Sequence, residues 1–295
     1  MTRLYSKFAI VDDVRSPAYA AIIKDLDELN TRYQLSDHTD LNASRYPWAV
    51  GMLSRPAFYA ARLWEYPFAI LTADLEPGMK VADIGCGMTA FTIYLKEHAR
   101  CEIVGVDPDV FESGTKYYAH GVSQEFIERT GLNIVKGEFD EIPLPSDSQD
   151  RVFCISVMEH VAPDVRRRGM QEIARILKPG GKAILTVDVS MLFELNRPLG
   201  LIWDSGLTLV EPADLRWPVR RFGMFDSKQP ADVFGMTLLK EDRHIETQYR
   251  SVNDEQVESV PAYRVPTLIP RGPGGKRPLW RRVGGSILRE IKKTE

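Results

Sequence analysis

The sequence is poor in cysteine, and the few cysteines it has follow no recognisable ligand pattern. Its 295 residues include three cysteines, Cys86, Cys101 and Cys154, with no CxxC pair and no zinc-ligand spacing. This spacing argues against a disulfide framework and against a structural metal site. Cys86 and Cys154 lie in or beside apolar stretches, so we expect buried free thiols and no bound metal.

The sequence also lacks a long apolar run and an excess of positive charge. No stretch approaches the roughly 18 apolar residues of a membrane span, and the most apolar segment, residues 57–73, is interrupted by Arg62 and Glu65. The first residues lack the apolar core of a signal peptide, so we expect a cytoplasmic protein. The formal net charge of −3 provides no global field that would attract nucleic acid, and we expect no nucleic-acid partner.

Changes in composition and hydrophobic pattern along the chain predict three parts. Residues 1–73 form a helical N-terminal extension or lid, in which Ser16 can cap a helix that starts at Pro17. Residues 74–245 form the main domain. Residues 246–295 form a C-terminal tail rich in proline and basic residues.

Within the main domain, short apolar runs alternate with helical patterns. The runs VADIG, EIVGVD, LNIVKG, RVFCISV and KAILTVDV are strand candidates, and a helical face with apolar residues at i, i+3, i+4 and i+7 precedes the last of them. Near-continuous Val/Ile/Leu strands indicate a parallel sheet covered by helices on both faces. Residues 206–212 and 231–242 are candidates for a late hairpin at the sheet edge.

A glycine turn follows the first strand candidate. In VADIGCGMTAF the strand runs into Gly85 and Gly87, and glycines allow backbone N–H groups to approach a ligand closely. Asp107 ends the next strand candidate, 20 residues after Gly87, where its carboxylate can accept hydrogen bonds from ribose hydroxyls. The same residues also fit a nicotinamide dinucleotide site, because Gly85, Gly87 and Ala90 match the loose Gly-x-Gly-x-x-Gly/Ala pattern.

Asp83 and the later motifs favour a different nucleoside. A carboxylate just before the turn would repel a pyrophosphate but attract a cationic sulfonium with its amino group. The blocks VADIGCG, VGVDPD, VKGEFDEIPLPSDSQDRVFCISVMEHV and EIARILKPGGKAILTVDV occur in order between residues 78 and 190. Together they resemble the class I S-adenosylmethionine-dependent methyltransferases. The resemblance implies a doubly wound, mostly parallel seven-stranded α/β sheet with an antiparallel last strand, and S-adenosyl-L-methionine as cofactor.

The resemblance also implies roles for individual residues. Nine of them are expected to bind the cofactor: Asp83, Gly85, Cys86, Gly87, Asp107, Pro108, Glu138, Phe139 and Ser156. The family's third turn glycine is replaced here by Thr89, a position that varies in the family. His160, just after the fourth strand, is the candidate catalytic base, although the shared Glu-His pair is also explained by a role in shaping the loop.

The resemblance implies that the acceptor is held by the N-terminal extension and by residues 191–235. The second segment combines aromatic and basic side chains, which fit an acceptor site and fit an ordinary surface segment equally well. We expect a small-molecule, glycan or lipid-linked acceptor, methylated at oxygen. A nicotinamide-dependent oxidoreductase and a non-catalytic S-adenosylmethionine-binding module are the alternatives. The tail has nine Lys/Arg between residues 264 and 295, and two interpretations stay open: an amphipathic contact with an anionic membrane, or a solvated segment.

Overall fold

The computed structural model describes residues 5–35, 62–110, 122–188, 202, 205–214 and 233–241. The predicted C-terminal tail, most of the expected acceptor segment at 191–235 and part of the N-terminal extension lie outside these residues.

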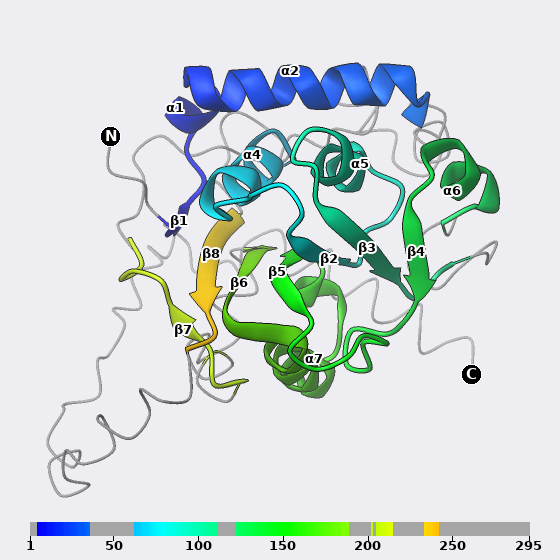
Figure 1. Ribbon diagram of the computed structural model, residues 1–295. Helices are drawn as coiled ribbons and strands as arrows, with labels where there is room; N and C mark the ends of the chain where they lie inside the picture. Colours follow the sequence, from blue (N-terminus) through cyan, green and yellow to red (C-terminus); the bar gives the residue numbers. More distant parts are fainter. Residues whose placement is uncertain are drawn as a thin grey trace, which may run out of the picture. The chain divides into compact units, whose positions relative to one another are not determined.

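A single twisted sheet organises the described chain (Figure 1). Its strands are β1 (Ser6–Phe8), β2 (Lys80–Ile84), β3 (Glu102–Asp107), β4 (Asn133–Lys136), β5 (Gln149–Ile155), β6 (Leu177–Asp188), β7 (Thr208–Leu209) and β8 (Val233–Leu239). The order is β1-β8-β6-β5-β2-β3-β4, with β7 also paired to β8. The pairs from β4 across to β6 are parallel, whereas β8 runs antiparallel to β6, β7 and β1. The predicted doubly wound, mostly parallel sheet with a late antiparallel hairpin is therefore confirmed.

The described helices are α1 (Val11–Val14), α2 (Pro17–Arg32), α4 (Arg62–Thr72), α5 (Ala90–Glu97), α6 (Gln124–Thr130) and α7 (Pro163–Ile176), with a 3-10 turn, η3, at Met158–His160. Two of them, α2 and α6, begin at a capping side chain. The Ser16 hydroxyl accepts a hydrogen bond from the N–H of Tyr19 at the start of α2, as expected. Ser123 caps α6 in the same way, and Gly131 ends that helix in the left-handed conformation.

Two apolar clusters lie on opposite faces of the sheet, because successive strand side chains point to opposite sides. On β5, Phe153 contributes to the cluster that also contains residues of α2, α4 and α5, whereas Val152 and Cys154 contribute to the cluster that contains residues of α7. Figure 1 shows this arrangement, with α2, α4 and α5 on one side of the sheet and α7 on the other. The sheet is thus buried on both faces, as its apolar strands predict.

The N-terminal residues complete the outer edge of the sheet. Strand β1 pairs with β8 from Ser6 opposite Met236 to Phe8 opposite Phe234, and β7 continues along the same strand. The sequence pattern predicts no strand at this position. The extension therefore contains a sheet strand in addition to its helices.

The cysteines and the surface agree with the composition. Cys86, Cys101 and Cys154 are buried and free, as predicted.

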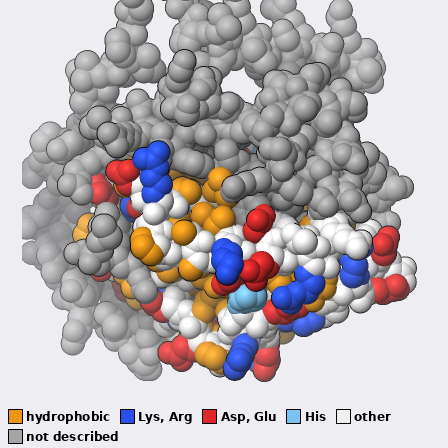
Figure 2. Space-filling model, turned by 90° about the horizontal axis from the view of Figure 1, so that it is seen from above, with side chains coloured by type: hydrophobic (Ala, Val, Ile, Leu, Met, Phe, Trp, Pro, Cys, Tyr) orange, Lys and Arg blue, Asp and Glu red, His pale blue; other side chains and the backbone are white. Residues whose placement is uncertain are grey.

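Seen from the side of α2, basic and acidic side chains are interspersed on the coloured surface (Figure 2). Among the described residues, no helix is both long and apolar enough to cross a membrane. Within the same residues, no group of His, Cys, Asp and Glu side chains is arranged to hold a metal ion.

Candidate functional site

The turn after β2 packs so closely that it requires glycine. Gly85 has a φ of +71°, and an added Cβ would lie 2.5 Å from a methyl carbon of Val157. Gly87 also has a positive φ, of +53°. The N–H of Gly85 donates to the carbonyl of Val106 at 2.7 Å, which fixes the turn against the end of β3. The glycines therefore allow the ends of β2, β3 and β5 to approach one another closely around the backbone of the turn.

Asp107 connects this turn to the end of β3. The N–H of Gly87 donates to its Oδ2 at 2.9 Å, and the N–H of Asp109 donates to its Oδ1 at 3.0 Å. Burial raises the pKa of Asp107, while the two N–H donors act in the opposite direction. The carboxylate is thus held in one orientation by the backbone, and each oxygen keeps a further lone pair for a ligand.

Asp83 lies within β2, beneath the turn. Its side chain is 3% exposed, and the Thr92 hydroxyl donates to its Oδ2 at 2.7 Å. Burial raises the pKa of Asp83 to about 7, because removal from water disfavours the charged form. The same side chain is near Arg62, whose positive charge favours the ionised form.

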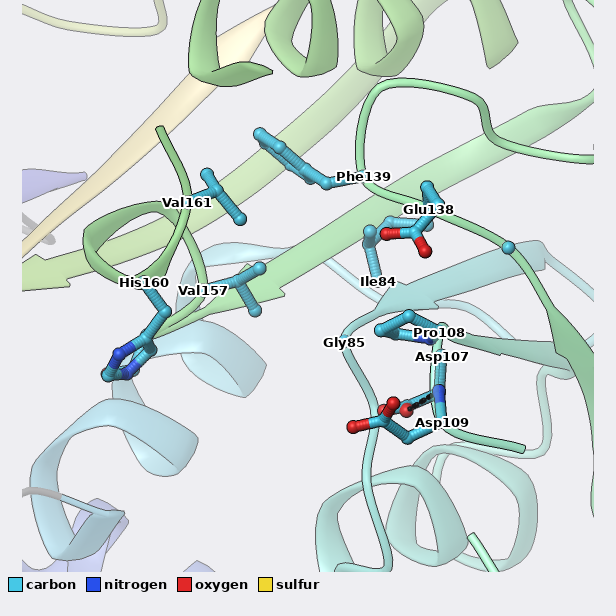
Figure 3. A pocket seen from close by; sticks show the side chains of 12 residues that line it. Ile84, Gly85, Asp107, Pro108, Asp109, Glu138, Phe139, Val157, His160 and Val161 are labelled. Atoms are coloured by element: carbon cyan, nitrogen blue, oxygen red, sulfur yellow. Dashed lines mark hydrogen bonds between the residues drawn. The ribbon is translucent and has the colours of Figure 1, made fainter. Parts of the chain in front are cut away.

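A pocket opens at the carboxyl ends of the strands, where ligands bind in open α/β sheets. It encloses about 760 Å³ of space, part of which is open to solvent. Figure 3 shows His160, Val157 and Val161 on one side of it, Asp107, Pro108, Asp109 and Glu138 on the opposite side, and Phe139 between the two. The complete lining is Ile84, Gly85, Asp107, Pro108, Asp109, Gly137, Glu138, Phe139, Ser156, Val157, His160 and Val161.

Most of the residues predicted from the sequence meet in this pocket. Those in its lining are Gly85, Asp107, Pro108, Glu138, Phe139, Ser156 and His160. Asp83, Cys86 and Gly87 are not in the lining; they support the turn from β2 and from the start of the following loop. The individual roles of these residues in binding stay predictions.

Asp109 gives an indication that the pocket accepts a hydrogen-bonding ligand. The residue is 6% exposed, and in the described part of the chain its Oδ2 has no hydrogen-bond partner. A buried carboxylate oxygen without a donor is unfavourable. The hydroxyl or amino groups of a nucleoside would provide such donors, so the wall around Asp107 and Asp109 fits the nucleoside that the motifs imply.

His160 is at the rim of the pocket, in the 3-10 turn η3. Its ring is exposed on one side, yet the protein around the other side lowers its pKa through desolvation. The positive charges of Arg62 and Arg166 lower the pKa further. His160 is therefore neutral at pH 7 and has a free ring nitrogen that can accept a proton.

Helix α4 contributes a residue that the sequence analysis did not select. Glu65 is fully buried and accepts a hydrogen bond from the hydroxyl of the pocket residue Ser156. The available signal was a pair of opposite charges, Arg62 and Glu65, three residues apart in an otherwise apolar helix. Charged residues are rarely buried without a partner, so this pair marked a specific contact.

Residues 82–185 match the family described as "Methyltransferase domain". Over these residues the chain is similar to methyltransferases. The matched residues include every site residue predicted from the sequence, and the family resemblance inferred from the four motifs is confirmed.

Two methyltransferases are similar in sequence to part of this chain. A sterol 24-C-methyltransferase from Aspergillus fumigatus is 34% identical over 128 residues, which are 42% of this chain and 32% of the relative. A 2-methyl-6-phytyl-1,4-hydroquinone methyltransferase from Oryza sativa is 30% identical over 129 residues, 43% of this chain and 36% of the relative. The chain thus spans about a third of the length of these curated relatives.

A solved structure is also similar. It is a TehB-like SAM-dependent methyltransferase from Corynebacterium glutamicum, with a TM-score of 0.45 and 18% sequence identity, covering 70% of this chain and 99% of that chain.

Proposed function

We propose that the protein transfers a methyl group from S-adenosylmethionine to a small, apolar, lipid-type acceptor. The observation that carries this proposal is the coincidence of the methyltransferase domain, residues 82–185, with the walls of the pocket. The cytoplasmic location expected from the sequence is part of the same proposal.

The donor side of the pocket fits the nucleoside part of S-adenosylmethionine. Asp107 is fixed by two backbone N–H groups and would accept the ribose hydroxyls, while Glu138 and Phe139 form the wall for the adenine. Gly85 removes any side chain from the turn that would hold the methionine part. When bound, S-adenosylmethionine provides a methyl group made electrophilic by the sulfonium.

The acceptor side of the pocket supports an apolar molecule. Val157 and Val161, on the same side as His160, present hydrocarbon side chains to the space. The names of the relatives specify a sterol and a phytyl hydroquinone, both largely hydrocarbon with a few hydroxyl groups. The protein has to align acceptor and methyl group and exclude water, and apolar walls do both.

We further propose oxygen as the methylated atom, with His160 as general base. The lowered pKa of His160 keeps its imidazole neutral at pH 7, so that it can remove the proton of a hydroxyl acceptor. A carbon acceptor, as in the sterol relatives, would not require this proton transfer at the start of the reaction. The two cases differ in their dependence on His160.

Titration calorimetry tests the donor first. We expect S-adenosylmethionine and S-adenosylhomocysteine to bind and NAD to give no heat. Binding of NAD with no response to either sulfur nucleoside would support a nicotinamide-dependent oxidoreductase and refute the proposal.

The acceptor is tested with methyl-labelled S-adenosylmethionine and a total lipid extract from cells. We expect label in the lipid fraction, and mass spectrometry of the product to place it on oxygen. His160→Gln should reduce the rate by about 10²-fold or more while leaving the affinity for S-adenosylhomocysteine unchanged. A product methylated on carbon, or an unaffected rate in this variant, would contradict the role given to His160. Label found only in water-soluble glycans would contradict the lipid-type acceptor.

A further inference from the structure

A buried carboxylate connects helix α4 to two strand ends beside the pocket. Glu65 is 0% exposed. Its Oε1 accepts hydrogen bonds from the Ser156 hydroxyl at 2.5 Å and from the Thr186 hydroxyl at 2.7 Å. Its Oε2 is paired with the guanidinium of Arg62, one helical turn earlier.

Packing alone does not require a carboxylate at this position. The neighbouring side chains Trp64 and Phe68 are fully buried, stack on one another and already fix α4 to the sheet. A buried ion pair is often no more stabilising than well-packed apolar residues of the same volume, because both charges lose their hydration. Glu65 is therefore better explained by what its hydrogen bonds hold in place.

The held residue is in an unusual conformation. Ser156 follows the end of β5 with a φ of +51°, in the left-handed region that non-glycine residues rarely adopt. Its N–H donates to the carbonyl of Thr186 in β6 at 3.1 Å, and its hydroxyl donates to Glu65. Both the backbone and the side chain of Ser156 are therefore held by hydrogen bonds. Such a conformation is higher in free energy and persists only where surrounding contacts hold the residue in it.

The loop that starts at Ser156 forms one wall of the pocket. Val157, the next residue, contacts Gly85 of the glycine turn, and His160 follows at the rim. The charge of Arg62 contributes to the lowered pKa of His160 and also acts on Asp83, so the guanidinium is near both sides of the site. A shift of Ser156 would therefore move the wall that faces Asp107 and Asp109 (Figure 3).

We propose that Glu65 is a positioning residue for the methyl-donor pocket, acting through the hydroxyls of Ser156 and Thr186. Helix α4 lies outside the methyltransferase match at residues 82–185, so this assigns a functional residue to the N-terminal part of the chain. The inference rests on the proposed function, because it concerns the same pocket.

The test separates positioning from stability with three variants of the full chain. Glu65→Gln keeps a carbonyl oxygen for the two hydroxyls but loses the ion pair with Arg62. It should lower the melting temperature and keep the dissociation constant for S-adenosylhomocysteine within about threefold of wild type. Ser156→Ala keeps the ion pair and loses one hydroxyl contact, so it should weaken that affinity about tenfold with a smaller effect on melting. Glu65→Met should weaken it at least about tenfold.

A double-variant cycle and a matched control complete the test. Adding Ser156→Ala to Glu65→Met should produce little further loss of affinity, because both changes remove the same contact. Thr72→Val, also buried in α4 but bonded only to the carbonyl of Phe68 among the described residues, should leave the affinity unchanged. All affinities are measured well below the melting temperatures.

The possible outcomes are distinct. Wild-type affinity in Ser156→Ala would overturn the positioning role while leaving the proposed function intact. Equal loss of affinity in Thr72→Val would also overturn it, because any damage to α4 would then have the same effect. If Glu65→Met does not fold, Thr186→Val decides the question, because Thr186 donates to Glu65 but is not in the pocket lining: weaker binding would support the positioning role, and wild-type affinity would overturn it. A wild-type protein that does not bind S-adenosylhomocysteine would overturn the proposed function, and this inference with it.

Discussion

Gly169, in the middle of α7, is expected to be required for the shape of the pocket. Glycine in a helix interior is unfavourable by about 1 kcal/mol relative to alanine, so Gly169→Ala would stabilise an isolated helix. In the fold, however, an added Cβ would lie 2.1, 2.2 and 2.6 Å from three ring carbons of Phe139. Ordinary contacts between carbon atoms are about 3.5–4.0 Å, so the Phe139 ring would have to move by more than about 1 Å.

The two effects have opposite signs, and the clash is expected to dominate. Overpacking a well-filled core usually costs about 1–3 kcal/mol, which exceeds the gain of about 1 kcal/mol in helix propensity. Phe139 is 5% exposed and packed in the cluster that contains Met170 and Ile173, so its ring has little room to turn. Because the added Cβ would overlap three ring carbons, we take the upper part of the overpacking range, about 2–3 kcal/mol. Less the helix gain of about 1 kcal/mol, this leaves a net destabilisation of about 1–2 kcal/mol, which corresponds to a melting temperature lower by about 2–8 °C.

Thermal unfolding and calorimetry with S-adenosylhomocysteine measure both consequences. Because Phe139 lines the pocket, Gly169→Ala should also weaken nucleoside binding, and the double variant with Phe139→Leu should recover part of the stability. Gln171→Gly, at an exposed position of the same helix, measures the effect of glycine on helix stability without the clash. An unchanged or higher melting temperature in Gly169→Ala would refute the argument, because it would show that the ring moves aside at no cost.

Three further predictions follow from the site and the tail. Asp107→Ala should weaken S-adenosylhomocysteine binding at least about tenfold, since it removes charge-assisted hydrogen bonds; calorimetry showing wild-type affinity would place the ribose elsewhere. Burial raises the pKa of Asp83 from 3.8 to about 7, so the folded chain retains a proton that the unfolded chain loses, and this group's contribution to stability falls as the pH rises through that interval. Urea unfolding between pH 4 and pH 8 should show a smaller fall for Asp83→Asn, and identical profiles would exclude Asp83 as the cause. Truncation after residue 250 should leave the melting transition and nucleoside affinity nearly unchanged; an insoluble product, or one that does not bind the nucleoside, would show that the tail is needed for the fold. Binding to anionic vesicles before and after truncation distinguishes a membrane contact from a solvated tail.

Local patterns in the sequence were sufficient for the parallel strands and their helices. The apolar runs of β2, β3 and β5 reflect burial on both faces, and the periodicity of α7 reflects burial on one. Caps such as Ser16 act within a few residues and can be recognised without knowledge of the fold. The glycine turn at Gly85 and the acid at Asp107 were recognisable for a similar reason, because their spacing follows from one strand, one helix and one further strand.

Contacts between distant parts of the chain depended on the tertiary structure. Strand β1 has only three residues, and nothing in its sequence specifies that Ser6 lies opposite Met236 at the open edge of β8. The burial of Glu65 was equally hidden, because its partners Ser156 and Thr186 are 91 and 121 residues away. Hydrophobic periodicity reports which face of an element is buried, but the partner of a buried polar group is determined by which distant strand ends the fold brings beside it.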